Sequence, residues 1–414
     1  MMQENNKLKT ALQKYFGYDS FRSGQEEIIT EIIEKRPVLA VLPTGAGKSI
    51  CFQLPSLLME GVTLVVSPLI SLMKDQAEAL CARGIKAAYL DSSMSGNAYG
   101  KILYDTLNGN CKFLYVAPER LANPQFVSFA RKAAISMVAV DEAHCVSQWG
   151  HSFRKDYYNI PRFIDCLPHK PLIAAFTATA TAEVRQDIIS KLHIEGAKTV
   201  VTGFDRPNLH FSVKRSADKE RTLLDFLEQH SKESGIIYCS TRKRVETVTA
   251  LLVRHGYLAL RYHAGLTSEE REFNQNCFVR DQVKLIVATN AFGMGIDKAD
   301  VRFVIHYNMP KDIESYYQEA GRAGRDGQKA ECLLLYDRSD IAVNTYLIGH
   351  DQPDLVWKEH ELQLLDKMIT YCNTSACLRN YLLQYFGEKT GGDCGNCGNC
   401  SQRANVSWRR FLNL

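Results

Sequence analysis

Five short apolar runs recur along the first half of the chain, and each ends in small or polar residues. Each run contains β-branched residues, which is typical of strands that are buried on both faces, and the longer segments between the runs suit crossover helices. The pattern predicts a parallel α/β sheet whose functional loops lie at the carboxyl ends of the strands. The runs are VLAVLPTG (38–45), TLVVSP (63–68), KFLYVAP (112–118), ISMVAVDEAH (135–144) and PLIAAFTATA (171–180).

A second set of similar runs predicts a second α/β lobe. These runs are SGIIYCSTR (234–242), LALRYHAGL (258–266), KLIVATNAFGMG (284–295), VRFVIHYNMP (301–310) and AECLLLYD (330–337). The polar, proline-containing segment GFDRPNLH (203–210) lies between the two sets and is expected to act as a hinge. Beyond this second set, ELQLLDKMITYC and CLRNYLLQYF predict helices before a tail rich in glycine and cysteine. We expect lobes at residues 1–206 and 207–340, followed by a small helical module at residues 341–414.

Composition limits the class of protein. Hydrophobic residues make up 45% of the chain and charged residues 23%, which is an ordinary globular mixture. The net charge of +4 permits a polyanionic partner without requiring one. The first residues, MMQENNKLKT, lack the apolar segment of a signal peptide, and no apolar run approaches the roughly 18 residues that span a bilayer. We therefore expect no membrane association and no secretion, with a cytoplasmic location in a bacterium or a nuclear one in a eukaryote.

The 13 cysteines fall into two groups. Nine are scattered, several of them in apolar segments, and we expect these to be small buried side chains rather than a disulfide framework. The other four have the spacing C-x₁₆-C-x₂-C-x₂-C, and four sulfur ligands suit a structural zinc ion on which folding of the module would depend. An iron–sulfur cluster is the alternative. The scattered set is Cys51, Cys81, Cys111, Cys145, Cys166, Cys239, Cys277, Cys332 and Cys372, and the metal-binding candidates are Cys377, Cys394, Cys397 and Cys400.

The segment PTGAGKS directly follows a predicted strand and precedes a predicted helix. Its glycines would let the backbone approach a phosphate, which successive N–H groups and the helix amino terminus then stabilise. Lys48 is expected to reach the terminal phosphates, and the Ser49 hydroxyl to ligate magnesium. The strict phosphate-loop pattern has glycine where this chain has Leu42, but the strand–turn–helix context still favours a nucleotide site. The predicted cofactor-binding residues of the loop are Pro43, Thr44, Gly45, Ala46, Gly47, Lys48 and Ser49.

The run MVAVDEAH places two adjacent carboxylates at the end of a predicted buried strand. Asp141 is expected to hold magnesium through water, and Glu142 to orient or deprotonate the attacking water. Together with the phosphate loop, this pair indicates hydrolysis of a nucleoside triphosphate. A transition-metal site at His144, Cys145 and His151 is the less favoured interpretation, because a structural zinc ion needs four ligands and no fourth is evident.

The second lobe supplies two arginines in YYQEAGRAGRDG, at positions 322 and 325. Their spacing would let both face one way across a helical turn. Arginines that reach a γ-phosphate stabilise charge in the transition state and contribute roughly 10³–10⁵ in rate. The alternative is a solvated turn with two surface arginines, but a chain with two lobes and one phosphate loop favours the catalytic role for Arg322 and Arg325.

In this order along the chain, the motifs resemble those of the RecQ family of superfamily 2 DNA helicases. FGYDSFRSGQEE resembles motif 0 of that family, in which Tyr18 and Arg22 would sandwich the adenine and Gln25 would hydrogen-bond its edge. VVSPLISLMKDQ and YVAPERL resemble motifs Ia and Ib, which face the nucleic acid. FTATAT resembles motif III, with Thr177 and Thr179 relaying between sites.

The remaining motifs extend the resemblance through the second lobe. IIYCSTR resembles motif IV, IVATNAFGMGIDK motif V and QEAGRAGRDG motif VI, which makes Arg325 the arginine finger and Arg322 a second phosphate contact. The cysteine spacing resembles the zinc module of RecQ enzymes.

The run CVSQWGHSFRKDYY, which follows the two carboxylates, resembles the aromatic-rich loop that couples DNA binding to hydrolysis in RecQ enzymes. The resemblance assigns Gln148 to nucleotide sensing, and Trp149, Phe153 and Arg154 to single-stranded DNA, with His151 in the same loop. Core packing is the alternative for the two aromatic residues. The interleaved glycine, serine, histidine and arginine favour an exposed loop.

The resemblance implies an α/β fold with two tandem RecA-like parallel-sheet lobes and a helical zinc-binding module. It also implies ATP, Mg²⁺ and one structural Zn²⁺, single-stranded DNA and tailed or forked duplex DNA as partners, and 3′-to-5′ movement of a monomer in DNA repair or recombination. Many family members continue into a winged helix that separates strands, whereas this sequence ends 14 residues after Cys400, so we expect weaker unwinding. Two alternatives stay open: a DNA-stimulated ATPase switch that barely unwinds, and an RNA-directed superfamily 2 helicase.

Overall fold

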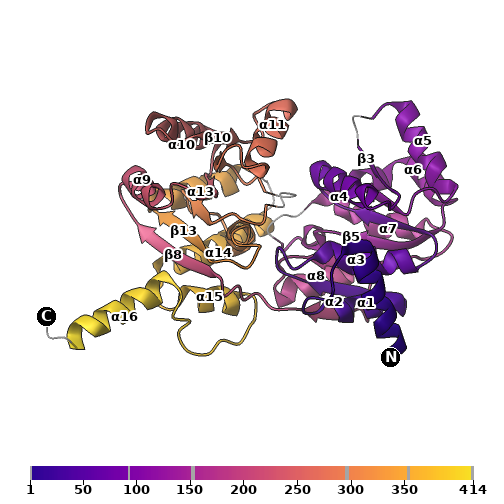
Figure 1. The fold of residues 1–414 in the computed structure, drawn as a ribbon, viewed down its shortest axis with the longest axis horizontal. Coiled ribbons are helices and arrows are strands. Elements are labelled where there is room, and N and C mark those ends of the chain that lie inside the picture. Colours follow the sequence, from indigo (N-terminus) through magenta and orange to yellow (C-terminus); the bar gives the residue numbers. More distant parts are fainter. Residues whose placement is uncertain (1, 92–93, 151–153, 294–297, 352–354, 412–414) are drawn as a thin grey trace. The chain divides into compact units, whose positions relative to one another are not determined.

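Figure 1 shows the chain as a computed structural model, which describes residues 2–91, 94–150, 154–293, 298–351 and 355–411. The chain divides into two compact units, Met1–Gly203 and Phe204–Leu414. Each unit has its own parallel sheet and its own apolar core. Within the described ranges, no helix combines the length and the apolar character that crossing a membrane requires.

Unit 1 is built on a seven-stranded sheet with the order β3-β4-β2-β5-β6-β1-β7, in which every neighbouring pair is parallel. The strands are β1 (Val38–Val41), β2 (Val62–Val66), β3 (Ala87–Leu90), β4 (Phe113–Val116), β5 (Ile135–Val140), β6 (Leu172–Thr177) and β7 (Lys198–Val201). The α-helices are α1 (Met2–Phe16), α2 (Gln25–Ile33), α3 (Lys48–Leu58), α4 (Ile70–Ala82), α5 (Gly96–Leu107), α6 (Pro124–Ala130), α7 (Asn159–Asp165) and α8 (Ala182–Lys191). Short 3₁₀ turns lie at Pro118–Ala122, Ala143–Val146 and Lys155–Tyr158.

The five apolar runs of the first half form β1, β2, β4, β5 and β6, as predicted. Every residue of β1, β2 and β4 is buried, because helices cover both faces of the sheet. The sequence pattern missed β3 and β7, which form the two edges of the sheet and are more exposed. Edge strands contact one neighbour only and need no continuous apolar run.

Unit 2 is built on a six-stranded parallel sheet with the order β10-β11-β9-β12-β13-β8. The strands are β8 (Leu209–Arg215), β9 (Gly235–Tyr238), β10 (Ala259–Tyr262), β11 (Leu285–Ala288), β12 (Phe303–His306) and β13 (Ala330–Tyr336). The helices are α9 (Lys219–Gln229), α10 (Arg242–Arg254), α11 (Ser268–Val279), α12 (Ile313–Ala320), α13 (Ser339–Asp351), α14 (Leu355–Asn373), α15 (Leu378–Tyr385) and α16 (Gly398–Phe411).

The second set of apolar runs forms β9 to β13, and the two helices predicted after residue 340 lie in α14 and α15. Strand β8 was not predicted, and its first residues lie in the segment that was expected to be a hinge. The last part of unit 2 packs on this edge strand, where Phe211 pairs with Cys397 in an isolated bridge. The predicted fold class, two parallel-sheet α/β lobes with a helical C-terminal module, is confirmed.

Gly235 is the first residue of β9, and a Cβ at this position would overlap the ring of Phe303 on the neighbouring strand β12. Phe303 is fully buried, so its ring cannot turn outward into solvent. We expect Gly235→Ala to lower the free energy of unfolding by about 1–3 kcal/mol, the usual cost of overpacking a core. Urea unfolding of the full chain, followed by fluorescence, measures this change.

The control is Gly349→Ala in helix α13, where the nearest heavy atom to an added Cβ is the Lys358 Nζ atom at 3.8 Å. Alanine favours a helix over glycine by up to about 1 kcal/mol, so this variant should be as stable as the original chain or more so. Equal stability of the two variants would contradict the steric argument.

Candidate functional site

The phosphate loop joins the end of β1 to the start of α3. Gly45 and Gly47 have φ angles of +86° and +83°, which favour glycine. A Cβ on Gly47 would lie 2.6 Å from the Gln25 Nε2 atom, so the loop also needs glycine for space. Lys48 is the first residue of α3, which places the loop at a helix amino terminus, where backbone N–H groups favour an anion.

Gln25, the first residue of α2, hydrogen-bonds to the phosphate loop and to Arg22 through both polar atoms of its side-chain amide. It is only 2% exposed; its Oε1 atom accepts from Arg22 N at 2.9 Å, and its Nε2 atom donates to the carbonyls of Ala46 (3.1 Å) and Gly47 (3.2 Å). The Arg22 guanidinium donates to the carbonyl of Gly45. Tyr18 is 47% exposed, so its ring is accessible for stacking. The adenine contacts of Tyr18, Arg22 and Gln25 stay predictions.

The Ser49 hydroxyl ends a chain of hydrogen bonds that runs into the core. It accepts from Gln76 Nε2 at 3.0 Å, while Gln76 Oε1 accepts from the Tyr115 hydroxyl at 3.1 Å. Gln53 Nε2 donates to the same Tyr115 hydroxyl at 3.1 Å. Gln76 belongs to the segment that resembles motif Ia, so this chain links the phosphate loop to a segment expected to face nucleic acid.

Asp141 and Glu142 follow β5, as the sequence predicts. Burial, and then the neighbouring Glu142 carboxylate, raise the pKa of Asp141 to about 7, against the opposing charge of Lys48. Glu142 has a φ of +47°, which is uncommon for any residue other than glycine and stores backbone strain. Two crowded carboxylates near Lys48 form a donor set that fits a hydrated magnesium ion, because a divalent cation stabilises their charged forms.

His144 connects these carboxylates to the segment that resembles motif III. Its Nδ1 atom lies 2.9 Å from the Thr177 hydroxyl and 3.4 Å from Glu142 Oε2. The Thr177 hydroxyl also contacts the backbone of Thr179, donating to its carbonyl at 3.0 Å. Both threonines are buried at the end of β6. Of the two expected relay residues, Thr177 is thus in direct contact with the DEAH segment, and Thr179 contacts Thr177.

The described part of the aromatic-rich loop has a mixed environment. Gln148 is exposed, and Trp149 is half-buried with its backbone N–H donating to the Ser147 hydroxyl at 3.2 Å. The Arg154 guanidinium donates to the carbonyl of Pro68 at 3.1 Å, and Pro68 lies in the segment that resembles motif Ia. The Tyr157 hydroxyl donates to the carbonyl of Asp141 at 2.8 Å, which ties the far end of the loop to the carboxylate pair. His151 and Phe153 lie outside the described residues.

The two arginines of unit 2 follow helix α12. Arg322 is 8% exposed, and its guanidinium donates to the carbonyl of Gly293 in the segment that resembles motif V. The same guanidinium is hydrogen-bonded to the phenol oxygen of Tyr238, whose pKa is raised chiefly by burial. Arg325 is half-buried three residues later. Arg322 thus lies in the interior of unit 2, in contact with the segments that resemble motifs IV and V.

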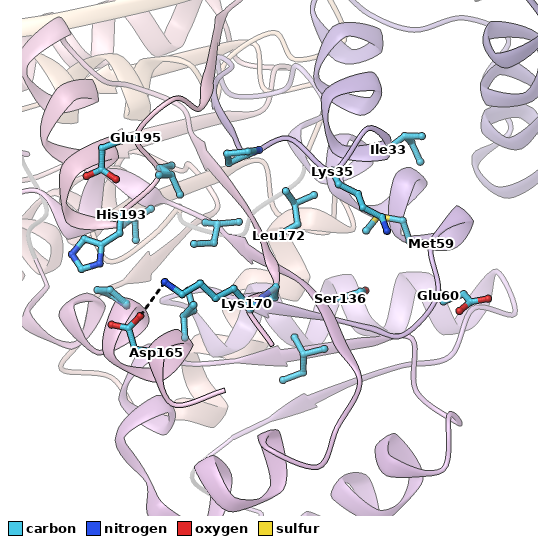
Figure 2. A pocket seen from close by; sticks show the side chains of 18 of the residues that line it. Ile33, Lys35, Met59, Glu60, Ser136, Asp165, Lys170, Leu172, His193 and Glu195 are labelled. Atoms are coloured by element: carbon cyan, nitrogen blue, oxygen red, sulfur yellow. Dashed lines mark ion pairs between the residues drawn. The ribbon is translucent and has the colours of Figure 1, made fainter. Parts of the chain in front are cut away.

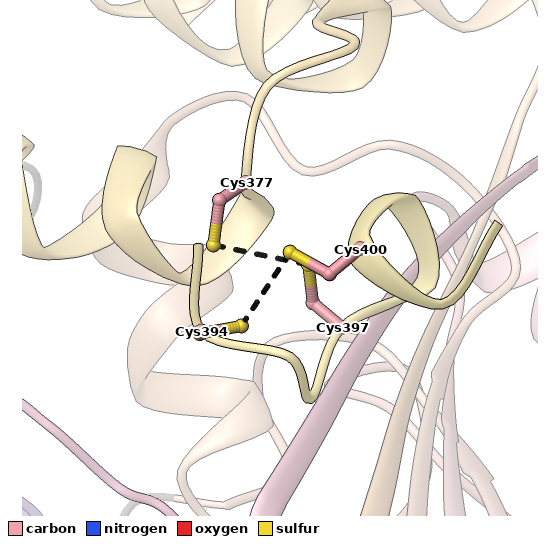
Figure 3. A group of neighbouring side chains, drawn as sticks. All are labelled: Cys377, Cys394, Cys397 and Cys400. Atoms are coloured by element: carbon pink, nitrogen blue, oxygen red, sulfur yellow. Dashed lines mark hydrogen bonds between the residues drawn. The ribbon is translucent and has the colours of Figure 1, made fainter. Parts of the chain in front are cut away.

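The four clustered cysteines converge, as predicted (Figure 3). All four sulfur atoms lie within 4.8 Å of one another, and the pairs Cys394–Cys400 and Cys377–Cys397 are each 3.9 Å apart. A tetrahedral zinc ion with Zn–S bonds of about 2.3 Å separates its ligands by about 3.8 Å, so the cluster has the dimensions of a structural zinc site. Backbone N–H of Asn396 donates to the Cys394 sulfur at 3.3 Å, as expected around a thiolate ligand.

Known families match three consecutive parts of the chain. Residues 22–188 match the DEAD/DEAH box helicases, residues 218–327 the helicase conserved C-terminal domain and residues 338–401 the RecQ zinc-binding family. The ATP-dependent DNA helicase RecQ of Bacillus subtilis is 47% identical over 391 residues, which cover 94% of this chain and 66% of the relative. The chain belongs to the RecQ helicase family.

The RecQ relatives that match this chain include longer proteins. The chain spans 60–66% of the length of three bacterial relatives named as RecQ DNA helicases. A protein of Acanthamoeba polyphaga mimivirus whose name specifies an RNA helicase is 39% identical over 392 residues, which cover 94% of this chain and 71% of that protein. The solved structure of the helicase MrfA bound to DNA has a TM-score of 0.68 at 17% identity, over 94% of this chain and 59% of that one, and shares the fold.

Sequence reasoning missed the buried residues whose hydrogen bonds hold the RecQ motifs in place. Gln76 and Tyr115 lie within segments that were matched to motifs Ia and Ib, but no local pattern indicates that they reach Ser49. His144 was weighed as a metal ligand, whereas its ring contacts Thr177. The sequence did offer one signal for such residues. A polar residue that a motif places in a buried position needs a hydrogen-bond partner, so its presence indicates a contact with another segment.

Unit 1 also has a cavity at the amino-terminal ends of its strands (Figure 2), whereas the phosphate loop follows the carboxyl end of β1. Its volume is about 810 Å³, and it opens near the first residues of β5 and β6, next to the ion pair between Lys170 and Asp165 (3.8 Å). None of the predicted site residues lines it. Size alone therefore does not identify the functional site of this unit.

The raised pKa of Asp141 predicts a pH-dependent stability. Between about pH 4 and pH 7 the folded chain retains a proton that the unfolded chain has lost, so without a divalent cation the free energy of unfolding falls as the pH rises through this window. Asp141→Asn removes the buried charge, and we expect its melting temperature at pH 8 to exceed that of the original chain by roughly 3 °C or more. Mg²⁺ should reduce this difference in melting temperature, because it should stabilise the original chain and not Asp141→Asn.

Thermal melts from pH 5 to pH 8, in chelator and in Mg²⁺, measure this effect. Asp165→Asn is the control, because Asp165 is an exposed carboxylate of the same unit and should show neither dependence. If Asp141→Asn and the original chain differ by the same amount at both ends of the pH range, Asp141 does not carry the buried charge.

Proposed function

We propose that this chain is the motor core of an ATP-dependent DNA helicase of the RecQ type. The observation that carries the proposal is the set of contacts in unit 1 that joins the phosphate loop, the Asp141–Glu142 pair and the threonine segment. These are the parts that hydrolysis of a nucleoside triphosphate needs. The names of the bacterial relatives add DNA as the nucleic acid.

In this proposal, each predicted site residue at the carboxyl ends of the unit 1 strands has one role. Lys48 contacts the terminal phosphates, and the loop N–H groups hold the phosphate charge. Magnesium, when bound, would neutralise charge on the transferred phosphoryl group, with Ser49 and Asp141 holding it. Glu142 takes a proton from the attacking water, and its contact with His144 passes the change to Thr177.

The arginines of unit 2 complete the proposed reaction. By resemblance to the family, Arg325 stabilises the γ-phosphate in the transition state and Arg322 makes a second phosphate contact. We further propose that ATP binding draws the two lobes together and that hydrolysis releases them, so that two DNA grips move relative to each other in the 3′-to-5′ direction. The cysteine cluster holds a structural zinc ion in this proposal. DNA repair or recombination is the proposed biological role.

Two other functions make different predictions. The first alternative is an RNA-directed helicase. It is worth testing because the mimivirus relative, whose name specifies an RNA helicase, is similar to 94% of this chain. The second alternative is a DNA-stimulated ATPase with weak unwinding.

The deciding experiment measures ATP hydrolysis and strand separation on the same preparation. We expect single-stranded DNA to stimulate hydrolysis more than RNA does, and a forked duplex with a 3′ tail to be unwound in preference to one with a 5′ tail. Lys48→Ala should lose both activities, because the phosphate charge is then uncompensated. A preference for RNA would establish the RNA-directed function, and strong hydrolysis without strand separation would establish the ATPase switch.

Trp149 provides a separate test of coupling. We expect Trp149→Ala to keep nucleotide affinity within about threefold and to lower stimulation by single-stranded DNA by about tenfold, since stacking on an aromatic ring contributes about 1–3 kcal/mol per base. Titration of ATPase rate against oligonucleotide concentration measures the change. Tyr104→Ala is the control, because Tyr104 on α5 is an aromatic residue with 67% exposure in the same unit. Unchanged stimulation in Trp149→Ala would assign its ring to packing alone.

A further inference from the structure

The first residues of unit 2, Phe204–Leu209, make contacts that a flexible hinge would not make. Phe204 is buried, and its ring stacks on Phe386 with centroids 4.4 Å apart and planes 15° apart. The carbonyl of Phe204 accepts a hydrogen bond from the Tyr317 hydroxyl of α12. This segment is therefore fixed within unit 2 at its first residue.

Arg206 extends from this segment to the turn that carries the two motif VI arginines, residues 321–327, which we call the motif VI turn. Its guanidinium donates to three backbone carbonyls of the turn, those of Gly321 (3.3 Å), Ala323 (3.1 Å) and Gly324 (2.9 Å). Asn208 adds hydrogen bonds from its Nδ2 atom to the carbonyls of Gly324 (2.8 Å) and Gln328 (2.9 Å). One short segment thus holds the motif VI turn through two side chains.

The motif VI turn needs these donors because α12 ends at Ala320. Carbonyls beyond a helix end have no helical partner and must be satisfied from elsewhere. A guanidinium presents its N–H groups in a rigid planar fork, so contact with several carbonyls fixes the direction of the turn as well as its position. Gly324 has a φ of +54°, and a Cβ there would lie 2.5 Å from Asn208 Nδ2, which shows how closely the segment and the turn pack.

The cysteine module holds the segment from its other side. Arg379, in the first turn of α15, donates to the Asp205 carboxylate at 2.6 Å and to the Arg206 carbonyl at 2.7 Å. Asn396, between two of the clustered cysteines, donates to the Pro207 carbonyl at 3.0 Å. The backbone that carries Arg206 is therefore fixed by residues next to Cys377 and Cys397.

We infer that Arg206 is a positioning residue for the reaction: it sets the placement of Arg322 and Arg325 by holding the backbone of the motif VI turn. The inference rests on the proposed ATP hydrolysis, in which these arginines act on phosphate. Arg206 donates to backbone carbonyls of the motif VI turn, within unit 2. Its loss therefore affects the chemical step and leaves the phosphate loop, which is in unit 1, unchanged.

The test compares Arg206→Ala with Arg215→Ala in the full chain. Arg215 lies on β8 and also donates to backbone carbonyls, those of Asn373 (2.9 Å) and Cys372 (3.4 Å) in α14, but not to the motif VI turn. Hydrogen exchange of the peptide that covers residues 321–327 reports the turn without any dependence on activity. The rate of DNA-stimulated ATP hydrolysis at varied ATP concentration separates kcat from KM.

For Arg206→Ala we expect about tenfold faster exchange in the motif VI turn and a kcat lowered by about tenfold or more, with KM for ATP within about threefold. Arg215→Ala should change none of the three. Arg206→Lys should fall between Arg206→Ala and the original chain, because an ammonium group lacks the planar fork. Asn208→Ala keeps the three carbonyl contacts of Arg206 but removes the Asn208 contacts, including the one from Arg206 Nε to Asn208 Oδ1 at 3.4 Å. It should give a smaller change of the same kind, and it serves if Arg206→Ala does not fold.

Unchanged exchange in the motif VI turn, or an unchanged kcat despite faster exchange, would overturn the inference. An equal loss of kcat in Arg215→Ala would also overturn it, since the effect would then be general to unit 2. If the original chain shows no nucleic-acid-stimulated hydrolysis, the proposed function fails instead, and the exchange measurement still decides whether Arg206 holds the turn.

Discussion

Parallel strands cannot be joined by tight hairpins, and this constraint places the candidate nucleotide site. Each strand needs a crossover connection, so the loops that follow the strands gather at one edge of the sheet. In unit 1 the central order β5-β6-β1 brings three distant motifs together at that edge. Val41, just before the phosphate loop, pairs with Thr177, and Val140, just before Asp141, pairs with Ala175. The sheet register itself therefore makes the motifs neighbours.

The same edge holds two carboxylates in an unfavourable electrostatic environment. Asp141 and Glu142 are adjacent carboxylates in a largely buried position, and the Glu142 backbone adopts a left-handed conformation. Among the described residues, the Glu142 Oε2 atom has a contact with His144 but no hydrogen bond within normal distance. Burial of such groups costs stability unless charge compensates it. The flanking strands β2 and β6 are buried where they pair with the end of β5, and they keep the carboxylates in place despite this cost, as expected where strain is retained for function.

The sequence pattern predicted central strands well and edge strands badly, for a physical reason. A central strand of a covered parallel sheet is apolar throughout, as in the VLAV run of β1. Of the four edge strands, β3, β7 and β8 were missed, and only β10 was predicted. β7 has one buried residue among four, and β8 alternates before it becomes exposed. Position at an edge depends on the whole topology, which no local window of sequence contains.

Within the candidate site, the motif residues were predictable because spacing along one loop determines their chemistry. The contacts that the structure adds act differently. Arg206 and Asn208 donate to backbone carbonyls of the motif VI turn, and Gln25, which was predicted only as an adenine contact, donates to backbone carbonyls of the phosphate loop. Such a contact depends on a carbonyl that every residue type has, so the partner leaves no signature in the sequence. Both loops also require glycine at the contact, at Gly47 and Gly324, because the donor side chain approaches the backbone too closely for a Cβ. A glycine in a functional loop can therefore indicate a donor that holds the loop as well as space for a phosphate.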